Sequence, residues 1–166
     1  MLTQELSRTL TTLLSELVDG APEPGAYILN RGDAGLLRSL DRLSAQDASG
    51  SSSGGATIAA HVDHVRYGLS LMNRWSAGEN PFQDADWGAA WRTGAVSEEA
   101  WARLRRDLAR EAHQWLGALG SPREANEVEL NGVVASVAHL AYHLGALRQI
   151  DRTLRGPREG DPPAGG

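Results

Sequence analysis

Apolar residues recur at three- and four-residue steps along much of this chain. Leucines between Leu2 and Leu17 draw one apolar stripe, which is the pattern of an amphipathic helix over residues 2–18. Similar stripes predict long helices over residues 57–75 and 131–154. The alternation of apolar and polar residues that is typical of strands is nearly absent. The pattern therefore predicts a helical protein.

Capping and turn residues indicate where the helices begin and end. Ser97 is a favourable N-cap and two glutamates follow it, which predicts a further long helix over residues 97–119, before Gly120. Asn131 is the predicted cap of the last helix, and Pro22 and Pro24 follow the end of the first.

The remaining segments are short or lack a clear period. Residues 35–43 predict a short helix, and the sequence GSSSGG at residues 50–55 predicts a flexible connection. Residues 156–166 are rich in glycine and proline and are expected to be disordered. We predict an all-α fold, a four-helix bundle with one short extra helix, as a single domain over residues 1–155.

Composition excludes several classes of function. The net charge of −5 argues against nucleic acid as a partner. The absence of a long uninterrupted apolar run argues against a membrane span, and the first residues do not have the pattern of a signal peptide. The chain has no cysteine, which fits a reducing cytoplasm and excludes sulfur ligands and thiolate nucleophiles of its own.

Four of the five histidines lie in two short helical windows. His139 and His143 are four residues apart and therefore share one face of the last helix, a spacing at which both imidazoles can bind the same ion. A pair with this spacing also arises by chance in structural helices. His113 stands alone and is interpreted as a surface or hydrogen-bonded residue.

A third ligand has to come from a neighbouring helix. On a helical wheel His61 lies roughly 60° from the centre of its own apolar stripe, and His64 roughly 120° away. His61 is therefore predicted to face the interior, and His64 to be a rim residue or a partner of a ligand. Trp87 and Trp91, in the irregular segment that follows, are expected to roof a pocket, to pack between subunits or to serve as plain packing.

The windows TIAAHVDHVRYGLSLMNRW and SVAHLAYHLGALRQI resemble the DinB-like family, also called the YfiT/DinB superfamily. The resemblance lies in their order and spacing, with one histidine early in the second long helix and an H-x-x-x-H pair in the last. It implies an up-down-down-up bundle with a three-histidine site for nickel or zinc. By position the implied ligands are His61, His139 and His143. Members often dimerise, so a homodimer is expected.

One position departs from the family pattern. Members commonly read H-x-G-Q after the last ligand, whereas this chain has Ala146 in place of the glutamine. The departure puts the fine tuning of the site in doubt but removes no ligand.

Two classes of function follow from these residues. Three imidazoles leave coordination positions open, as catalytic metal sites do. The resemblance implies a thiol S-transferase that uses bacillithiol, mycothiol or glutathione, or a hydrolase, and a thiol would have to arrive as a small molecule. The alternative is a non-catalytic, dimerising bundle in which the metal is structural. An open cleft beside the ion favours the enzyme, and a filled one favours the alternative.

Overall fold

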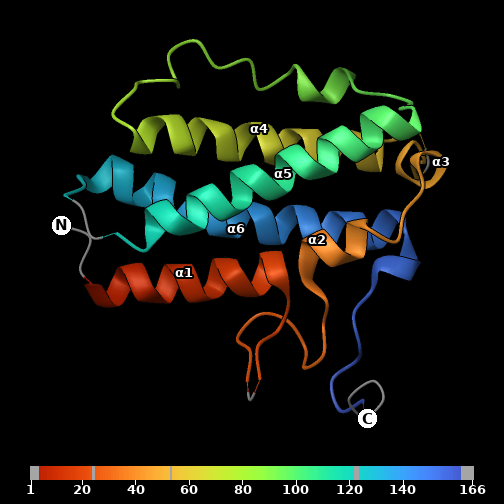
Figure 1. The fold of residues 1–166 in the computed structure, drawn as a ribbon, viewed down its shortest axis with the longest axis horizontal. Coiled ribbons are helices and arrows are strands. Elements are labelled where there is room, and N and C mark those ends of the chain that lie inside the picture. The colour runs from red at the N-terminus through yellow and green to blue at the C-terminus, as the bar shows by residue number, and fades with distance from the viewer. Residues whose placement is uncertain (1–3, 24, 53, 122–123, 162–166) are drawn as a thin grey trace.

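The computed structural model describes residues 4–23, 25–52, 54–121 and 124–161, and all regular elements within these ranges are helical. In chain order they are α1 (Gln4–Asp19), α2 (Gly35–Leu40), α3 (Ala45–Ala48), α4 (Ile58–Ser76), the 3-10 turn η1 (Ala90–Arg92), α5 (Glu98–Leu119), α6 (Glu127–Ile150) and the 3-10 turn η2 (Arg152–Leu154) (Figure 1). The all-α prediction is confirmed. Predictions at Leu2, Pro24, Ser53, Pro122 and residues 162–166 lie outside the described residues.

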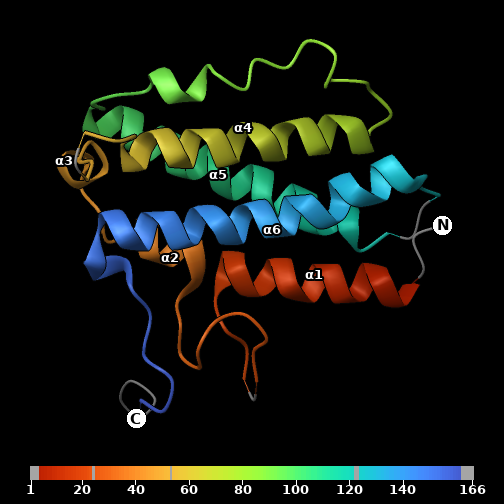
Figure 2. The same ribbon diagram turned by 180° about the vertical axis from the view of Figure 1, so that it is seen from behind.

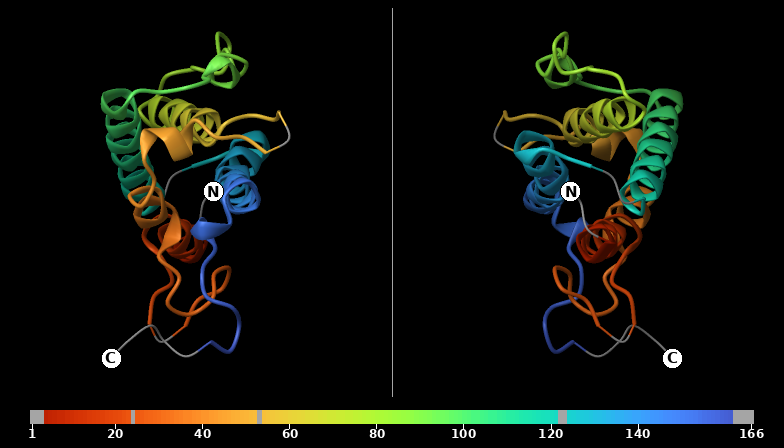
Figure 3. Two further views of the ribbon diagram at one scale, coloured as in Figure 1. Left: turned by 90° about the vertical axis from the view of Figure 1, so that its right-hand side faces the viewer. Right: turned by 90° about the vertical axis from the view of Figure 1, so that its left-hand side faces the viewer.

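The four long helices pack side by side around one core. Both α1 and α4 pack against α5 and α6, so α1 and α4 lie on opposite sides of the core (Figure 3). Helices α4 and α5 run in one direction, and α1 and α6 run in the other (Figures 1 and 2). This arrangement brings one face of α4 against one face of α6, where the two histidine windows lie.

Two tryptophans of α5 fill much of the core. Trp101 and Trp115 have no exposed surface. The indole of Trp101 donates a hydrogen bond to the carbonyl of Leu43 at 2.8 Å, and that of Trp115 donates to Ser136 Oγ at 2.9 Å. Because buried indole N–H groups need an acceptor, these hydrogen bonds fix the orientation of each tryptophan ring, while the ring itself fills space in the core.

The predicted helix starts at Thr57 and Ser97 are confirmed. Their side chains accept hydrogen bonds from the backbone N–H groups of Ala60 and Ala100. The prediction of Asn131 as the cap of the last helix was wrong, because the cap of α6 is Asn126, five residues earlier. Asn126 and Glu129 form a reciprocal capping box, which satisfies two N–H groups at the helix start.

The short helix predicted over residues 35–43 is present but shorter, and a further short helix, α3, follows it outside the predicted range. Helix α2 ends at Leu40, and α3 starts separately at a capping box between Ser44 and Asp47. At the other end of the chain, the carbonyl of Pro157 accepts a hydrogen bond from the Asn30 side chain at 2.9 Å. The disorder predicted for residues 156–166 stays a prediction.

Among the described helices, α6 is long and apolar enough to cross a membrane by length and composition alone. Its apolar residues include Val133, Leu140, Leu144 and Leu147, which are buried in the core. The core helix of a soluble protein passes the same test. Of the apolar window of α6, 39% is buried, where the helix packs against α1 and α4.

The segment between α4 and α5, residues 77–97, lies across the outer side of α4 (Figures 1 and 2). We call it the α4–α5 connection. Tyr67 of α4 accepts a hydrogen bond from the backbone N–H of Asp86 at 3.0 Å, and Thr57 donates to the carbonyl of Thr93 at 3.2 Å. These bonds hold the connection, with Trp87 and Trp91, against the helix that carries His61 and His64.

Candidate metal centre

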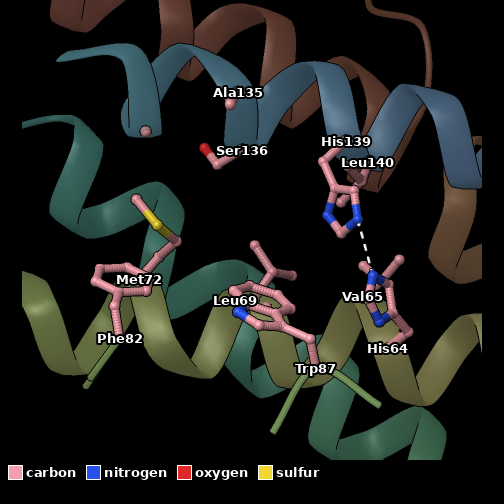
Figure 4. Close-up of a pocket in the computed structure, with 12 residues that line it drawn as sticks. His64, Val65, Leu69, Met72, Phe82, Trp87, Ala135, Ser136, His139 and Leu140 are labelled. Carbon is pink, nitrogen blue, oxygen red and sulfur yellow. Dashed lines mark hydrogen bonds between the residues drawn. The ribbon is translucent and has the colours of Figure 1, made fainter. Parts of the chain in front are cut away.

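Four histidines meet where α4 faces α6. We call His61, His64, His139 and His143 the histidine cluster. Helix α4 supplies the first two and α6 the last two, and Figure 4 shows His64 and His139 pointing toward each other from the two helices. The two windows singled out in the sequence therefore form one site.

Three of the four side chains bring ring nitrogens together. Nε2 of His139 lies 3.0 Å from Nε2 of His64 and 3.0 Å from Nε2 of His143. The ligand atoms of these three residues all lie within 4.8 Å of one another. In a tetrahedral zinc site with bonds of 2.0–2.1 Å, neighbouring nitrogens are about 3.3 Å apart. The spacing of these nitrogens fits a single bound ion.

Hydrogen bonding alone does not account for this spacing. A ring nitrogen of a neutral imidazole offers either one N–H or one lone pair. His139 Nε2 faces two other nitrogens at once and can make one well-directed bond to only one of them. A metal ion at the common centre accepts a lone pair from each of the three rings.

His61 meets the cluster on a different side. Its Nδ1 lies 2.9 Å from Nδ1 of His143, whose Nε2 faces His139. No single nitrogen of His143 faces both His61 and His139. The ligand set His61, His139 and His143 stays a prediction, and the geometry brings His64 rather than His61 to the shared position.

The prediction that His64 is a rim residue was wrong. His64 is 8% exposed and His143 is 3% exposed, whereas His61 and His139 are half-buried. The prediction used only the angle of each residue from the apolar stripe of α4. However, α4 is covered by α5, α6 and η1, so residues well outside its stripe are buried too.

Aromatic rings of the α4–α5 connection cover the cluster. Trp91 stacks on His64 with ring centroids 4.4 Å apart and an angle of 29° between the planes, and it meets His61 edge-on at 5.2 Å. Trp87 lies 5.8 Å from His64. The two tryptophans therefore roof the site, the first of the three roles expected for them, and restrict the access of water to His64.

Burial lowers the pKa of every histidine in the cluster, because the charged form loses hydration. The effect is largest for His143, where burial and then the neighbouring His139, His61 and His64 lower the pKa to about 3. Asp63 opposes the shift at His64. All four rings are thus neutral at pH 7, which is the form that binds a metal.

A cavity of about 340 Å³ opens beside the cluster (Figure 4). His64 and His139 line one end of it, and Trp87 and Phe82 of the α4–α5 connection line its wall. Gly68 leaves room there, because a Cβ at this position would contact Trp87 at 3.5 Å and His139 at 3.7 Å. The cluster is therefore next to an open cleft.

Two residues outside the histidine cluster, His113 and Arg148, have other partners. His113 is exposed and forms a hydrogen bond with Asp19 at 3.0 Å, as its interpretation as a surface residue expects. Arg148, which follows the last histidine by five residues, pairs with the buried Asp33 at 2.7 Å and so anchors the loop before α2.

The chain matches no protein-family model, and comparison with curated proteins and with solved structures finds no similar protein. Its function is therefore inferred from the chemistry of the cluster and the cavity.

Proposed function

We propose that this protein is a metal-dependent enzyme in which His64, His139 and His143 hold one divalent ion, zinc or nickel. The observation that carries the proposal is the convergence of three neutral ring nitrogens on one position, with pairs 3.0 Å apart. Imidazole suits both metals, and the chain has no cysteine to compete with it as a ligand.

His61 takes the role of a positioning residue in this proposal. With Nε2 of His143 on the ion, its Nδ1 carries the proton and donates to His61 Nδ1 at 2.9 Å. Ligating histidines usually donate their second nitrogen in this way, which fixes the tautomer and the plane of the ring. Protein–metal sites depend on such partners for affinity, so His61 contributes without touching the ion.

The proposed chemistry follows from the open side of the site. A divalent ion with three protein ligands keeps a position free and lowers the pKa of a water or thiol bound there, which supplies a nucleophile at neutral pH. No acidic side chain is found among the described residues that line the cavity, so no carboxylate there serves as a general base. A thiol cosubstrate is a small molecule, which a reducing cytoplasm would keep available.

Membership of the DinB-like family is part of the proposal. It is supported by the order of helix directions, with α4 and α5 opposed to α1 and α6, and by the histidines on α4 and α6. We accordingly propose thiol S-transfer or hydrolysis as the reaction. The open cavity beside His64 and His139 favours the enzyme over a non-catalytic bundle, in which this space would be filled.

Activity of the zinc- and nickel-loaded protein tests the proposal. The assays would follow transfer of a thiol to an electrophile such as monochlorobimane, and hydrolysis of p-nitrophenyl acetate. We expect one of these reactions in the loaded protein and its loss in His143→Ala, with His113→Ala unaffected. Equal rates in His143→Ala and the unaltered protein would contradict the proposal.

A further inference from the structure

The lining of the cavity indicates the chemical class of the molecule that it takes. The cavity lies between α4 and α6 under the α4–α5 connection (Figure 4). Most of its lining side chains are aliphatic or aromatic, namely Val65, Leu69, Met72, Phe82, Trp87 and Leu140. Its volume of about 340 Å³ is in the range of pockets for small molecules.

No charged partner for a ligand is found in this lining. Arginine, aspartate and glutamate are all missing from the described residues that line the cavity. Ser136 is already engaged, because its Oγ donates to the carbonyl of Val133 at 2.7 Å and accepts from Trp115 at 2.9 Å. The indole N–H of Trp87 is a neutral donor, and the two histidines are the proposed ligands of the ion.

Away from the end formed by His64 and His139, where the proposed ion would itself pair with an anion, a charged group in this cavity would therefore lose its hydration without gaining a partner. Such a transfer is costly for an ion, whereas an apolar group gains from leaving water. We infer that the cavity takes a neutral molecule with an apolar body, which packs along Leu69, Met72 and Phe82. The inference rests on the proposed function in one respect, which is that the reacting group lies at the end formed by His64 and His139.

In a thiol transfer, the two substrates would then bind in different places. Glutathione carries carboxylates, so a thiol of this kind does not fit the apolar cavity. In an S-transferase the cavity thus holds the apolar acceptor, and the thiol reaches the ion from outside it. In a hydrolase the cavity holds the apolar part of the substrate.

Two fluorescent probes with one skeleton test the inference. N-phenyl-1-naphthylamine is neutral, and 8-anilinonaphthalene-1-sulfonate adds one negative charge to the same rings. Ala135 is exposed and lines the cavity, so Ala135→Phe places a ring inside it. Ala95 of the α4–α5 connection is also exposed but does not line the cavity, and Ala95→Phe is the matched control.

We expect saturable binding of the neutral probe, at least about tenfold tighter than that of the sulfonate. Ala135→Phe should weaken binding of the neutral probe by about tenfold or more, and Ala95→Phe should leave it unchanged. Equal affinity for the two probes, or binding that is insensitive to Ala135→Phe, would overturn the inference.

The titrations are made on zinc-loaded protein and on protein treated with EDTA, with the metal content measured in each sample. Binding that responds to Ala135→Phe in protein unable to hold metal would support the inference while contradicting the proposed function. The two probes are compared in EDTA-treated protein, where no ion can pair with the sulfonate. A protein that holds zinc when loaded, but after EDTA treatment binds the neutral probe no better than the sulfonate, would overturn the inference alone.

Discussion

Each member of the histidine cluster is defined by the ring nitrogen that it presents. His64, His139 and His143 turn Nε2 to a shared position, whereas His61 meets His143 through Nδ1. His143 meets two of these neighbours through different nitrogens. Its Nε2 faces His139, the other proposed ligand on α6, and its Nδ1 faces His61, the proposed positioning residue on α4. His143 would therefore connect the proposed ion to His61.

Substitution of the two α4 histidines distinguishes their roles. His64→Ala should weaken zinc binding by more than about 100-fold, because it removes a ligand. His61→Ala should weaken it by only about 10- to 100-fold, because it removes a partner of a ligand. Titration against a chromophoric chelator measures both. The opposite order would instead support the ligand set His61, His139 and His143.

The lowered pKa values predict how stability depends on pH in the metal-free protein. The folded state keeps the four rings neutral, whereas in the unfolded chain their pKa returns to 6.5. Below about pH 6.5 the unfolded state thus binds more protons, and the free energy of unfolding should fall as the pH falls. The loss should continue toward pH 3, where His143 also takes up a proton.

Urea unfolding of EDTA-treated protein between about pH 7 and pH 5 measures this slope above the range in which most carboxyl groups titrate. His143→Gln should reduce the slope, because one titrating group is removed. A free energy of unfolding that does not change over this interval would contradict the burial of neutral histidines.

The start of helix α6 is determined by local sequence. Asn126 accepts a hydrogen bond from the N–H of Glu129 at 3.0 Å, and the Glu129 carboxylate accepts one from the N–H of Asn126 at 2.8 Å. Asn126→Ala should lower the free energy of unfolding by about 1 kcal/mol. Asn131→Ala, on the exposed face inside the helix, should change it by less than about 0.5 kcal/mol. The reverse result in urea unfolding would contradict the capping box.

The helix starts at Thr57 and Ser97 could be predicted from the sequence, because the apolar stripe of α4 begins directly after Thr57 and two glutamates follow Ser97 in the first turn of α5. Asn126 was missed because the period of α6 becomes clear only several residues later, although the spacing N-x-x-E was the available signal. The position of His64 could not be predicted from α4 alone. It depends on α6 and on Trp91 of an irregular segment, and those contacts are between residues far apart in the sequence.

Helix α6 exposes a face without charged side chains on the surface of the molecule. Val128, Val134 and Tyr142 are 80%, 46% and 70% exposed, and Ala138 and Gly145 are exposed between and beyond them. We propose that a second copy of the chain covers this face, which would form the homodimer expected from the family resemblance. Apolar helix faces of this kind are typical of subunit interfaces.

Sedimentation of the protein and of Tyr142→Arg tests the dimer. A buried arginine on each side of a two-fold interface is unpaired, so the variant should be a monomer. Tyr27 is 79% exposed and lies in the loop after α1, so Tyr27→Arg should keep the dimer. A monomeric unaltered protein, or a dimer that survives Tyr142→Arg, would contradict the proposed interface.

We have proposed that α4 and α6 together hold one metal ion. Metal analysis by mass spectrometry on the untagged protein tests it most directly, with His143→Ala and His113→Ala beside it. We expect about one zinc or nickel ion per chain in the unaltered protein and in His113→Ala, and none in His143→Ala. Absence of bound metal, with no uptake when zinc or nickel is added, would contradict it.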